Sequence, residues 1–234
     1  MNDLKMIGYI NYLKTVLAVL ALLSLMACQN PSQSANGLVA EPNSEAELFV
    51  FGDNLAAGYG SNYSFAEVLA ATKGLEVVDK TFSGANAVVN NTLNLSWLSD
   101  VDQNDTVILC VGYQDVRWYG VSYPYVDNYN NHISPFLLAL KATGARVYIV
   151  GPIKMKASSY GLFAPSNNGS NQAMIDFNTN LSSSVAALND SDFTFVDIMS
   201  FVPQASNLTP DEQFPNELGH DEITSIILNQ IGSL

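Results

Sequence analysis

The side chains that could do chemistry follow two predicted strands. Asp53 and Asn54 follow the apolar run 48–51 after a single glycine, Gly52, and Gln114 and Asp115 come shortly after a second apolar run. A continuous apolar run that ends in turn residues predicts a strand buried on both faces of a parallel sheet. Because ligands of such sheets bind at the carboxyl ends of the strands, we expect a site where these four side chains lie.

The same oxygen-bearing side chains, together with Asp211, could serve a metal ion. Carboxylate and amide oxygens are the ligands that Ca²⁺ prefers. Their spacing, however, follows no metal-loop pattern. We therefore expect no metal and no other cofactor.

The first of these stretches resembles the opening motif of a known enzyme family. Residues 49–60 read Phe-Val-Phe-Gly-Asp-Asn-Leu-Ala-Ala-Gly-Tyr-Gly. The motif of the SGNH (GDSL) hydrolases reads Phe-Gly-Asp-Ser-Leu-(small)-x-Gly-Tyr-Gly, and its Ser is the nucleophile of ester hydrolysis. In this sequence the nucleophile position holds Asn54.

Three further blocks resemble the family in the same order, and the resemblance extends over residues 48–234. By that resemblance, the backbone N–H of Gly84 would belong to the oxyanion hole. Gln114 stands where the family has Asn as the side-chain oxyanion donor. In the last block Asp211 matches the Asp that orients the catalytic His, and the position of that His holds Phe214.

These replacements remove the groups that the family's reaction needs: a hydroxyl, a base and oxyanion donors. The amide nitrogen of Asn54 has a delocalised lone pair, and Phe214 cannot accept a proton. In a serine-hydrolase triad the loss of Ser or His alone costs about 10⁶ in kcat, and a lost oxyanion donor costs about 10²–10³. With no His to orient, Asp211 is expected to be a cap or turn residue.

Few other residues could replace the missing groups. His220 lies six residues after Phe214, where the family also has a structural His or Tyr. His132 lies among Asn residues on a predicted helix, where we expect it to be solvated or capping. Ser83 adjoins the oxyanion-hole block, where the family often has a non-catalytic Ser. Cys110 lies within an apolar run and is expected to be a buried thiol.

Residues 117–129 are rich in aromatic side chains, with one of the two Trp and four of the eleven Tyr. Aromatic rings with polar tips stack on sugars or acyl groups and bury well at interfaces. The alternative is that these rings pack the loop onto the domain. The residues that we expect to line a cleft are Asp53, Asp115, Trp118, Tyr119 and Tyr123.

Strands that alternate with helices predict a parallel sheet covered on both faces, in one three-layer α/β/α domain over residues 48–234. The family resemblance implies the five-stranded, flavodoxin-like SGNH-hydrolase fold. Strands are predicted from residue 48, at 75–79, 106–112, 145–151 and 193–198. Helices are predicted at 65–71, 85–98, 127–143, 171–189 and 217–231.

The amino terminus predicts export. Residues 1–27 combine a lysine-bearing lead with a short apolar run, which is typical of a secretory signal. The run ends Leu-Met-Ala-Cys, which resembles a bacterial lipobox and implies that Cys28 carries lipid. Because Gln29 follows instead of Asp, the resemblance implies the outer membrane. Residues 28–47 are polar and predict a flexible tether. The alternatives are an ordinary signal peptide cut near Ala27 and an uncleaved anchor.

The charge of the chain excludes some partners. It has 22 acidic and 9 basic residues, a net charge of −13, and no basic run. Such a chain repels phosphate backbones, so we expect no nucleic-acid binding. It also repels anionic lipid, which leaves the acyl chains on Cys28 as the expected membrane attachment.

We therefore expect an SGNH-hydrolase-like lipoprotein of the bacterial envelope. It would be inactive as an esterase and would bind a glycan, acyl or protein ligand in the former cleft. One alternative is an active esterase or acyl transferase with a rearranged site, which requires a Ser–His pair near Asn54. Another is a structural lipoprotein, in which Asn54 and Phe214 fill the cleft.

Overall fold

The computed structural model describes residues 46–82, 93–156 and 170–232. Five parallel strands form one sheet in the order β2-β1-β3-β4-β5. This is the flavodoxin-like order, so the predicted fold class is confirmed. The strands are β1 (Glu47–Gly52), β2 (Glu76–Thr81), β3 (Thr106–Cys110), β4 (Arg146–Val150) and β5 (Phe193–Val196).

The register brings the carboxyl ends of the strands to one edge of the sheet. Gly52, the last residue of β1, pairs with Thr81 of β2 and with Cys110 of β3. Cys110 in turn pairs with Val150 of β4. Segments that leave the sheet after these residues therefore start side by side, which places Asp53 close to the chain that follows β3.

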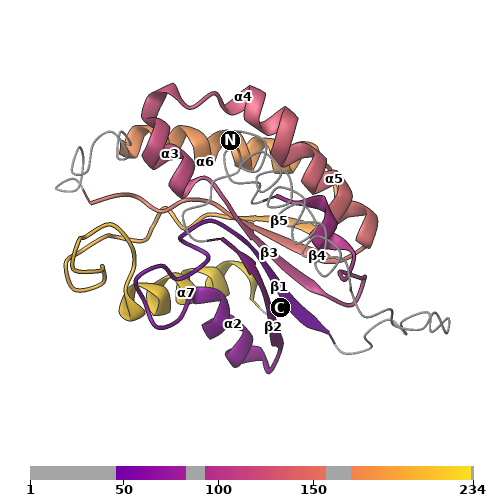
Figure 1. The fold of residues 1–234 in the computed structure, drawn as a ribbon, viewed down its shortest axis with the longest axis horizontal. Coiled ribbons are helices and arrows are strands. Elements are labelled where there is room, and N and C mark those ends of the chain that lie inside the picture. Colours follow the sequence, from indigo (N-terminus) through magenta and orange to yellow (C-terminus); the bar gives the residue numbers. More distant parts are fainter. Residues whose placement is uncertain (1–45, 83–92, 157–169, 233–234) are drawn as a thin grey trace, which may run out of the picture. The chain divides into compact units, whose positions relative to one another are not determined.

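Helices cover both faces of the sheet (Figure 1), with α2 and α7 on one face and α3 to α6 on the other. This arrangement buries the apolar runs of β1, β3 and β4 on both faces. The α-helices are α2 (Phe65–Lys73), α3 (Tyr113–Tyr119), α4 (Tyr125–Asn128), α5 (Ser134–Thr143), α6 (Asn171–Ala187) and α7 (Glu217–Ile231).

Local sequence signals explain where several helices begin and end. Ser64 caps α2 in a capping box with Glu67, and Gly74 ends the helix in the left-handed conformation. Asn216 caps α7, whose bounds match the prediction. Ser170 caps α6, which ends two residues before its predicted end. In each of these helices the capping side chain accepts a backbone N–H of the first turn, which fixes where the helix begins.

Two helical predictions were incomplete. The predicted helix 127–143 starts two residues earlier and contains a π-helical segment, η3 (Tyr129–Ile133), just before α5. Pro135 lies in the first turn of α5 and has no backbone N–H to continue the α pattern across this point. Of the predicted helix 85–98, the described part contains the 3₁₀ turn η1 (Leu95–Leu98).

The stretch that we predicted as an aromatic loop begins as helix α3 and continues into the short 3₁₀ helix η2 (Gly120–Ser122). Gly112 precedes α3 with a φ of 103°, and a Cβ there would lie 2.1 Å from the ring of Phe177. Only Gly combines this backbone with such a close approach, which lets the start of α3 pack on α6. Among the described helices, none is long and apolar enough to cross a membrane.

Candidate functional site

Asp53 fixes the loop that leaves β1. Its carboxylate is buried; one oxygen accepts a hydrogen bond from the backbone N–H of Leu55 at 3.0 Å, and the other from that of Gln114 at 2.9 Å. It therefore ties this loop to the first turn of α3. Burial raises the pKa of Asp53 to about 6, although these two N–H groups and the positive charge of Arg117 oppose the shift.

Asn54 and Gln114, the predicted nucleophile and oxyanion-donor positions, lie together. The side-chain N–H of Asn54 donates to Oε1 of Gln114 at 3.4 Å. Arg117, one turn further along α3, donates from Nη1 to the same oxygen at 3.2 Å. Because guanidinium only donates, the Gln114 atom that faces it must be the oxygen. The amide of Gln114 therefore presents its acceptor, not a donor, to Asn54 and Arg117.

Arg117 is 3% exposed and joins this group to the last block of the sequence. Its Nη2 donates to Oε1 of Gln213. Its guanidinium carbon lies 4.6 Å from the ring centre of Phe214 and 5.5 Å from that of Tyr113. A buried cation is stabilised by ring faces and amide oxygens such as these. Sequence analysis did not identify this role for Arg117.

Phe214, the predicted position of the catalytic His, lies in an apolar cluster and is 4% exposed. Its ring packs in an edge-to-face arrangement with the rings of Tyr59 and Tyr113, at distances between ring centres of 4.9 Å and 5.9 Å. A tight loop holds it in place, since the N–H of Thr209 donates to the carbonyl of Phe214 at 2.7 Å. Arg117 packs on the same ring, so the ring is held by contacts on several sides.

Asp211 supports Gln213. One carboxylate oxygen accepts from the hydroxyl of Thr209 at 2.6 Å and from the backbone N–H of Gln213 at 3.2 Å. The other accepts from the side-chain N–H of Gln213 at 3.0 Å. Asp211 is thus a turn residue that orients Gln213, and the hydrogen bonds run on through Arg117 and Gln114 to Asn54.

Neither histidine takes the place of a catalytic base. His220 is buried in α7, and its Nδ1 accepts the backbone N–H of Phe65 at 3.1 Å. Its lone pair is therefore already used, and burial lowers its pKa to about 4. His132 lies in η3. Cys110 is a buried thiol at the end of β3, and burial raises its pKa well above the ordinary range.

The predicted cleft-lining aromatics separate into two groups. Trp118 is 44% exposed on α3. Tyr119 and Tyr123 contact each other at 6.0 Å between ring centres, and Tyr123 also packs on Phe177 of α6 at 5.5 Å. Tyr123 therefore takes part in packing between helices. Asp115 is fully buried on α3.

Some predicted positions lie outside the described residues: Cys28, residues 28–45 of the predicted tether 28–47, Ser83 and Gly84. The last residue of that tether, Glu47, is instead the first residue of β1. Within the described part, no group of three or more His, Cys, Asp or Glu side chains is placed to hold a metal ion. The carboxylates that the sequence analysis considered as Ca²⁺ ligands and set aside have other partners. Both oxygens of Asp53 accept backbone N–H groups, and both oxygens of Asp211 accept hydrogen bonds from its own loop.

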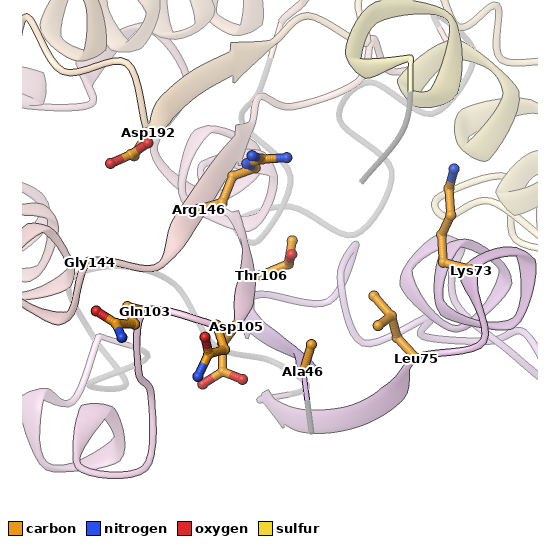
Figure 2. Close-up of a pocket in the computed structure, with 10 residues that line it drawn as sticks. Ala46, Lys73, Leu75, Gln103, Asp105, Thr106, Gly144, Arg146 and Asp192 are labelled. Atoms are coloured by element: carbon orange, nitrogen blue, oxygen red, sulfur yellow. The ribbon is translucent and has the colours of Figure 1, made fainter. Parts of the chain in front are cut away.

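A cavity of about 400 Å³ lies at the opposite, amino ends of the strands. Figure 2 shows Thr106 and Arg146 at the starts of β3 and β4, Ala46 just before β1, and Lys73 at the end of α2. None of the residues in the predicted catalytic positions lines this cavity. It is therefore separate from the hydrogen-bonded group around Arg117.

The family model of the GDSL-like lipases and acylhydrolases matches residues 48–227. The chain belongs to this family. No curated protein matches the chain in sequence.

Solved structures share the GDSL fold. A protein assigned to the G-D-S-L lipolytic family from Desulfitobacterium hafniense matches with a TM-score of 0.59 at 18% identity, covering 78% of this chain and 97% of its own. A catalytic mutant of the acetylxylan esterase Axe2 from Geobacillus stearothermophilus matches with a TM-score of 0.59 at 18% identity. The match covers 83% of this chain and 97% of the Axe2 chain. A protein from Bacteroides fragilis that is assigned as an acylhydrolase also matches with a TM-score of 0.59 at 18% identity. The match covers 82% of this chain and 88% of that chain.

Proposed function

We propose that this GDSL-family protein does not hydrolyse esters by the family mechanism and acts by binding. The observation that carries the proposal is the closed centre, which we define as Asn54, Gln114, Arg117, Gln213 and Phe214. Three of its five members, Asn54, Arg117 and Phe214, are 5%, 3% and 4% exposed. A substrate carbonyl would have to displace these side chains to approach residue 54.

The chemistry of the closed centre supports the same conclusion. Asn54 is not a nucleophile, and Phe214 cannot take up a proton. Gln114 points an acceptor toward Asn54, whereas a developing oxyanion requires donors. The histidine nearest to Phe214 in the sequence, His220, already accepts a hydrogen bond from the backbone N–H of Phe65 at Nδ1. An esterase with a rearranged site would need another base.

Binding in the former cleft is restricted by the same burial, because Asn54 and Phe214 fill positions that a ligand would enter. We place ligand contact on the surface next to the closed centre. Tyr59, which packs on Phe214, is 49% exposed, and Trp118 beside Arg117 is 44% exposed. Half-exposed aromatic rings suit a glycan, an acyl group or a protein partner. Axe2 is an acetylxylan esterase, which makes a glycan a reasonable first ligand to test.

The location is also a proposal. The lipobox-like ending at Cys28 supports an envelope lipoprotein, attached through lipid and facing envelope components. A purely structural lipoprotein remains the second candidate, because the burial of Asn54 and Phe214 is what that hypothesis expects.

Ester hydrolysis tests the proposal directly. The purified protein should not hydrolyse p-nitrophenyl acetate above the rate of the matched variant Asn54→Ala, and a serine-directed organophosphate should not label it. Saturable turnover that is lost in Ser83→Ala or His220→Asn would contradict the proposal and favour a rearranged esterase site. Glycan arrays with the wild type and Trp118→Ala then test the binding part.

A further inference from the structure

Arg117 is a buried cation whose donors are incompletely used. The residue is 3% exposed, and its Nε is buried with no hydrogen-bond partner. Nη1 donates to Oε1 of Gln114, and Nη2 donates to Oε1 of Gln213. Because buried donors are nearly always hydrogen-bonded in folded proteins, the free N–H of Nε marks a place where an acceptor is missing.

The charge of Arg117 also lacks a partner in direct contact. No carboxylate in the described part of the chain forms an ion pair with it. Asp53 lies close enough for the charge of Arg117 to oppose the rise in its pKa, but both oxygens of Asp53 already accept backbone N–H groups. The acceptors that reach the guanidinium are therefore two neutral amide oxygens. A buried cation with neutral partners gains from direct contact with an anion.

The free N–H lies on the same edge of the guanidinium as Nη2. In arginine, the N–H of Nε and one N–H of Nη2 are parallel, and together they match the two oxygens of a carboxylate. Here this edge has a single acceptor, the amide oxygen of Gln213. The nitrogen of the same amide cannot be the second acceptor, because it only donates, in this case to Asp211 at 3.0 Å. Gln213 therefore fills one half of a two-oxygen site.

The side chain of Gln213 is the part of the closed centre that a ligand can replace. Gln213 is half-buried, whereas Asn54 and Phe214 are almost completely buried. Its backbone is held separately, since its N–H donates to Asp211 and its carbonyl accepts the hydroxyl of Tyr113. The side chain can therefore turn outwards while the turn stays in place. A carboxylate has nearly the size of a primary amide, so it fits the space that the amide leaves.

We propose that Arg117 binds the carboxylate of an organic acid in place of the side-chain amide of Gln213. The two carboxylate oxygens accept from Nε and Nη2, while Nη1 keeps its hydrogen bond to Gln114. A charge-assisted bidentate pair is stronger than a single hydrogen bond to a neutral amide, which favours the exchange. The inference rests on the proposed function, since it names the ligand class of the same centre.

The surroundings of Arg117 favour an acid with an apolar body. The guanidinium packs on Phe214, and Tyr59, which also packs on Phe214, is 49% exposed. A half-exposed ring next to the centre offers contact to an alkyl group. The net charge of −13 repels anions at long range, so affinity depends on these direct contacts. Hexanoate combines a carboxylate with an alkyl chain and is the probe that we choose.

The experiment is a calorimetric titration of the purified protein with sodium hexanoate at pH 7, where the acid is ionised. Hexanoate should bind saturably, and 1-hexanol, which has the same chain without the charge, should not. Arg117→Lys keeps the positive charge but lacks the two parallel donors, so it should weaken hexanoate binding about 10-fold. Unchanged binding in this variant would show a general charge effect and would overturn the proposal.

Gln213→Ala tests the exchange itself, because it removes the side chain that competes with the ligand. Hexanoate should bind this variant about 3–10-fold more tightly, the factor expected when one neutral hydrogen bond no longer has to be broken. Gln103→Ala is the matched control, since it makes the same change at an exposed residue at the amino ends of the strands. It should leave binding unchanged.

Three further results would overturn the proposal: no tightening in Gln213→Ala relative to Gln103→Ala, no saturable binding of hexanoate to the wild type, or equal binding of 1-hexanol. Failure of the carboxylate site is distinguishable from failure of the proposed function. Ester hydrolysis would contradict the proposed function even if hexanoate binds at Arg117. A protein that neither hydrolyses esters nor binds hexanoate would contradict the carboxylate site alone.

Discussion

The guanidinium group of Arg117 lies over the ring of Phe214, with 4.6 Å between its central carbon and the ring centre. Taking a guanidinium out of water costs several kcal/mol, which must be offset by nearby groups. Here the offsetting groups are the Phe214 ring and two amide oxygens, those of Gln114 and Gln213. The replacement of a catalytic base by an aromatic ring and the burial of an arginine thus belong to one arrangement.

The first prediction concerns this arginine. Arg117→Lys should lower the free energy of unfolding by about 1–3 kcal/mol, because a single ammonium cannot reproduce the planar fork that reaches two oxygens and packs on a ring. Urea unfolding followed by circular dichroism measures the loss. The matched control is Arg146→Lys, at an exposed residue of β4, which should change stability by less than about 0.5 kcal/mol. Similar losses in both variants would show that the Arg117 contacts add little.

The second prediction separates the surface aromatics from those that pack between helices. Tyr123→Ala should cost about 2–4 kcal/mol, since its ring packs on Phe177 and Tyr119. Trp118→Ala should change stability by less than about 1 kcal/mol, because Trp118 is 44% exposed. Thermal unfolding of both variants checks this. A large drop in Tm for Trp118→Ala would mean that its ring serves packing and not ligand contact.

The third prediction is a pair of opposing pH effects. Burial raises the pKa of Asp53 from 3.8 to about 6, so the folded state binds this proton more tightly than the unfolded state does. Protonated Asp53 therefore stabilises the fold at low pH, and this stabilisation is lost as pH rises from about 4 to 6. Burial lowers the pKa of His220 from 6.5 to about 4, so protonation favours the unfolded state and stability is lost as pH falls from about 6.5 to 4. Each shift corresponds to about 3 kcal/mol.

His220→Asn tests these signs, because the Asn oxygen can accept the N–H of Phe65 in place of Nδ1. When pH falls from 7 to 4.5, the wild type should lose about 2–3 kcal/mol of unfolding free energy relative to the variant, because only the wild type has His220 to protonate on unfolding. Other titrating groups cancel in this difference. If the difference stays constant with pH, His220 is not held neutral by burial.

Much of the fold could be predicted from the sequence, because its elements depend on local patterns. The apolar run before Asp53 predicted the correct strand, and the helix predicted at 65–71 is α2, which ends two residues later. The fold class and the family also followed from the short blocks around the strand ends. Such blocks are local in the chain, so a single sequence is enough to find them.

The closed centre could not be predicted, because it depends on side chains that are far apart in the sequence. Arg117 lies 96 residues from Gln213, and no local pattern links them. Helix α3 was missed because Tyr113–Tyr119 is rich in aromatic residues and follows a glycine, which indicated a loop. Once α3 is known, the three-residue spacing of Gln114 and Arg117 places both on one face, and the contact becomes foreseeable.

The fourth prediction tests the membrane anchor. Replacing Cys28 by Ser should release the protein from bacterial membranes into the soluble envelope fraction, since lipid cannot attach without the thiol. Flotation of membranes in 1 M salt, with immunodetection of the protein, measures this. Mass spectrometry of the wild type should show an acylated Cys28. A processed Cys28→Ser protein that still floats would contradict the lipid anchor.

The last prediction concerns restoration of the family's chemistry. The triple change Asn54→Ser, Gln114→Asn and Phe214→His would place a hydroxyl, a donor and a base at the three positions. Asn54→Ser alone should do almost nothing, because triad members act as a unit. The triple variant should also remain poor, because Arg117 packs on residue 214 and a neighbouring positive charge lowers the pKa of a His there. The new His should also cost about 1–3 kcal/mol of stability.

A fourth change, Arg117→Met, removes that charge while keeping an unbranched side chain over residue 214. We therefore expect the quadruple variant to react with a serine-directed organophosphate faster than the triple variant, and both to react faster than Asn54→Ser. Peptide mass spectrometry locates the label, which should be on residue 54. Circular dichroism confirms that each variant is folded. A folded quadruple variant without a label on residue 54 would count against the assignment of Asn54 and Phe214 to the nucleophile and base positions.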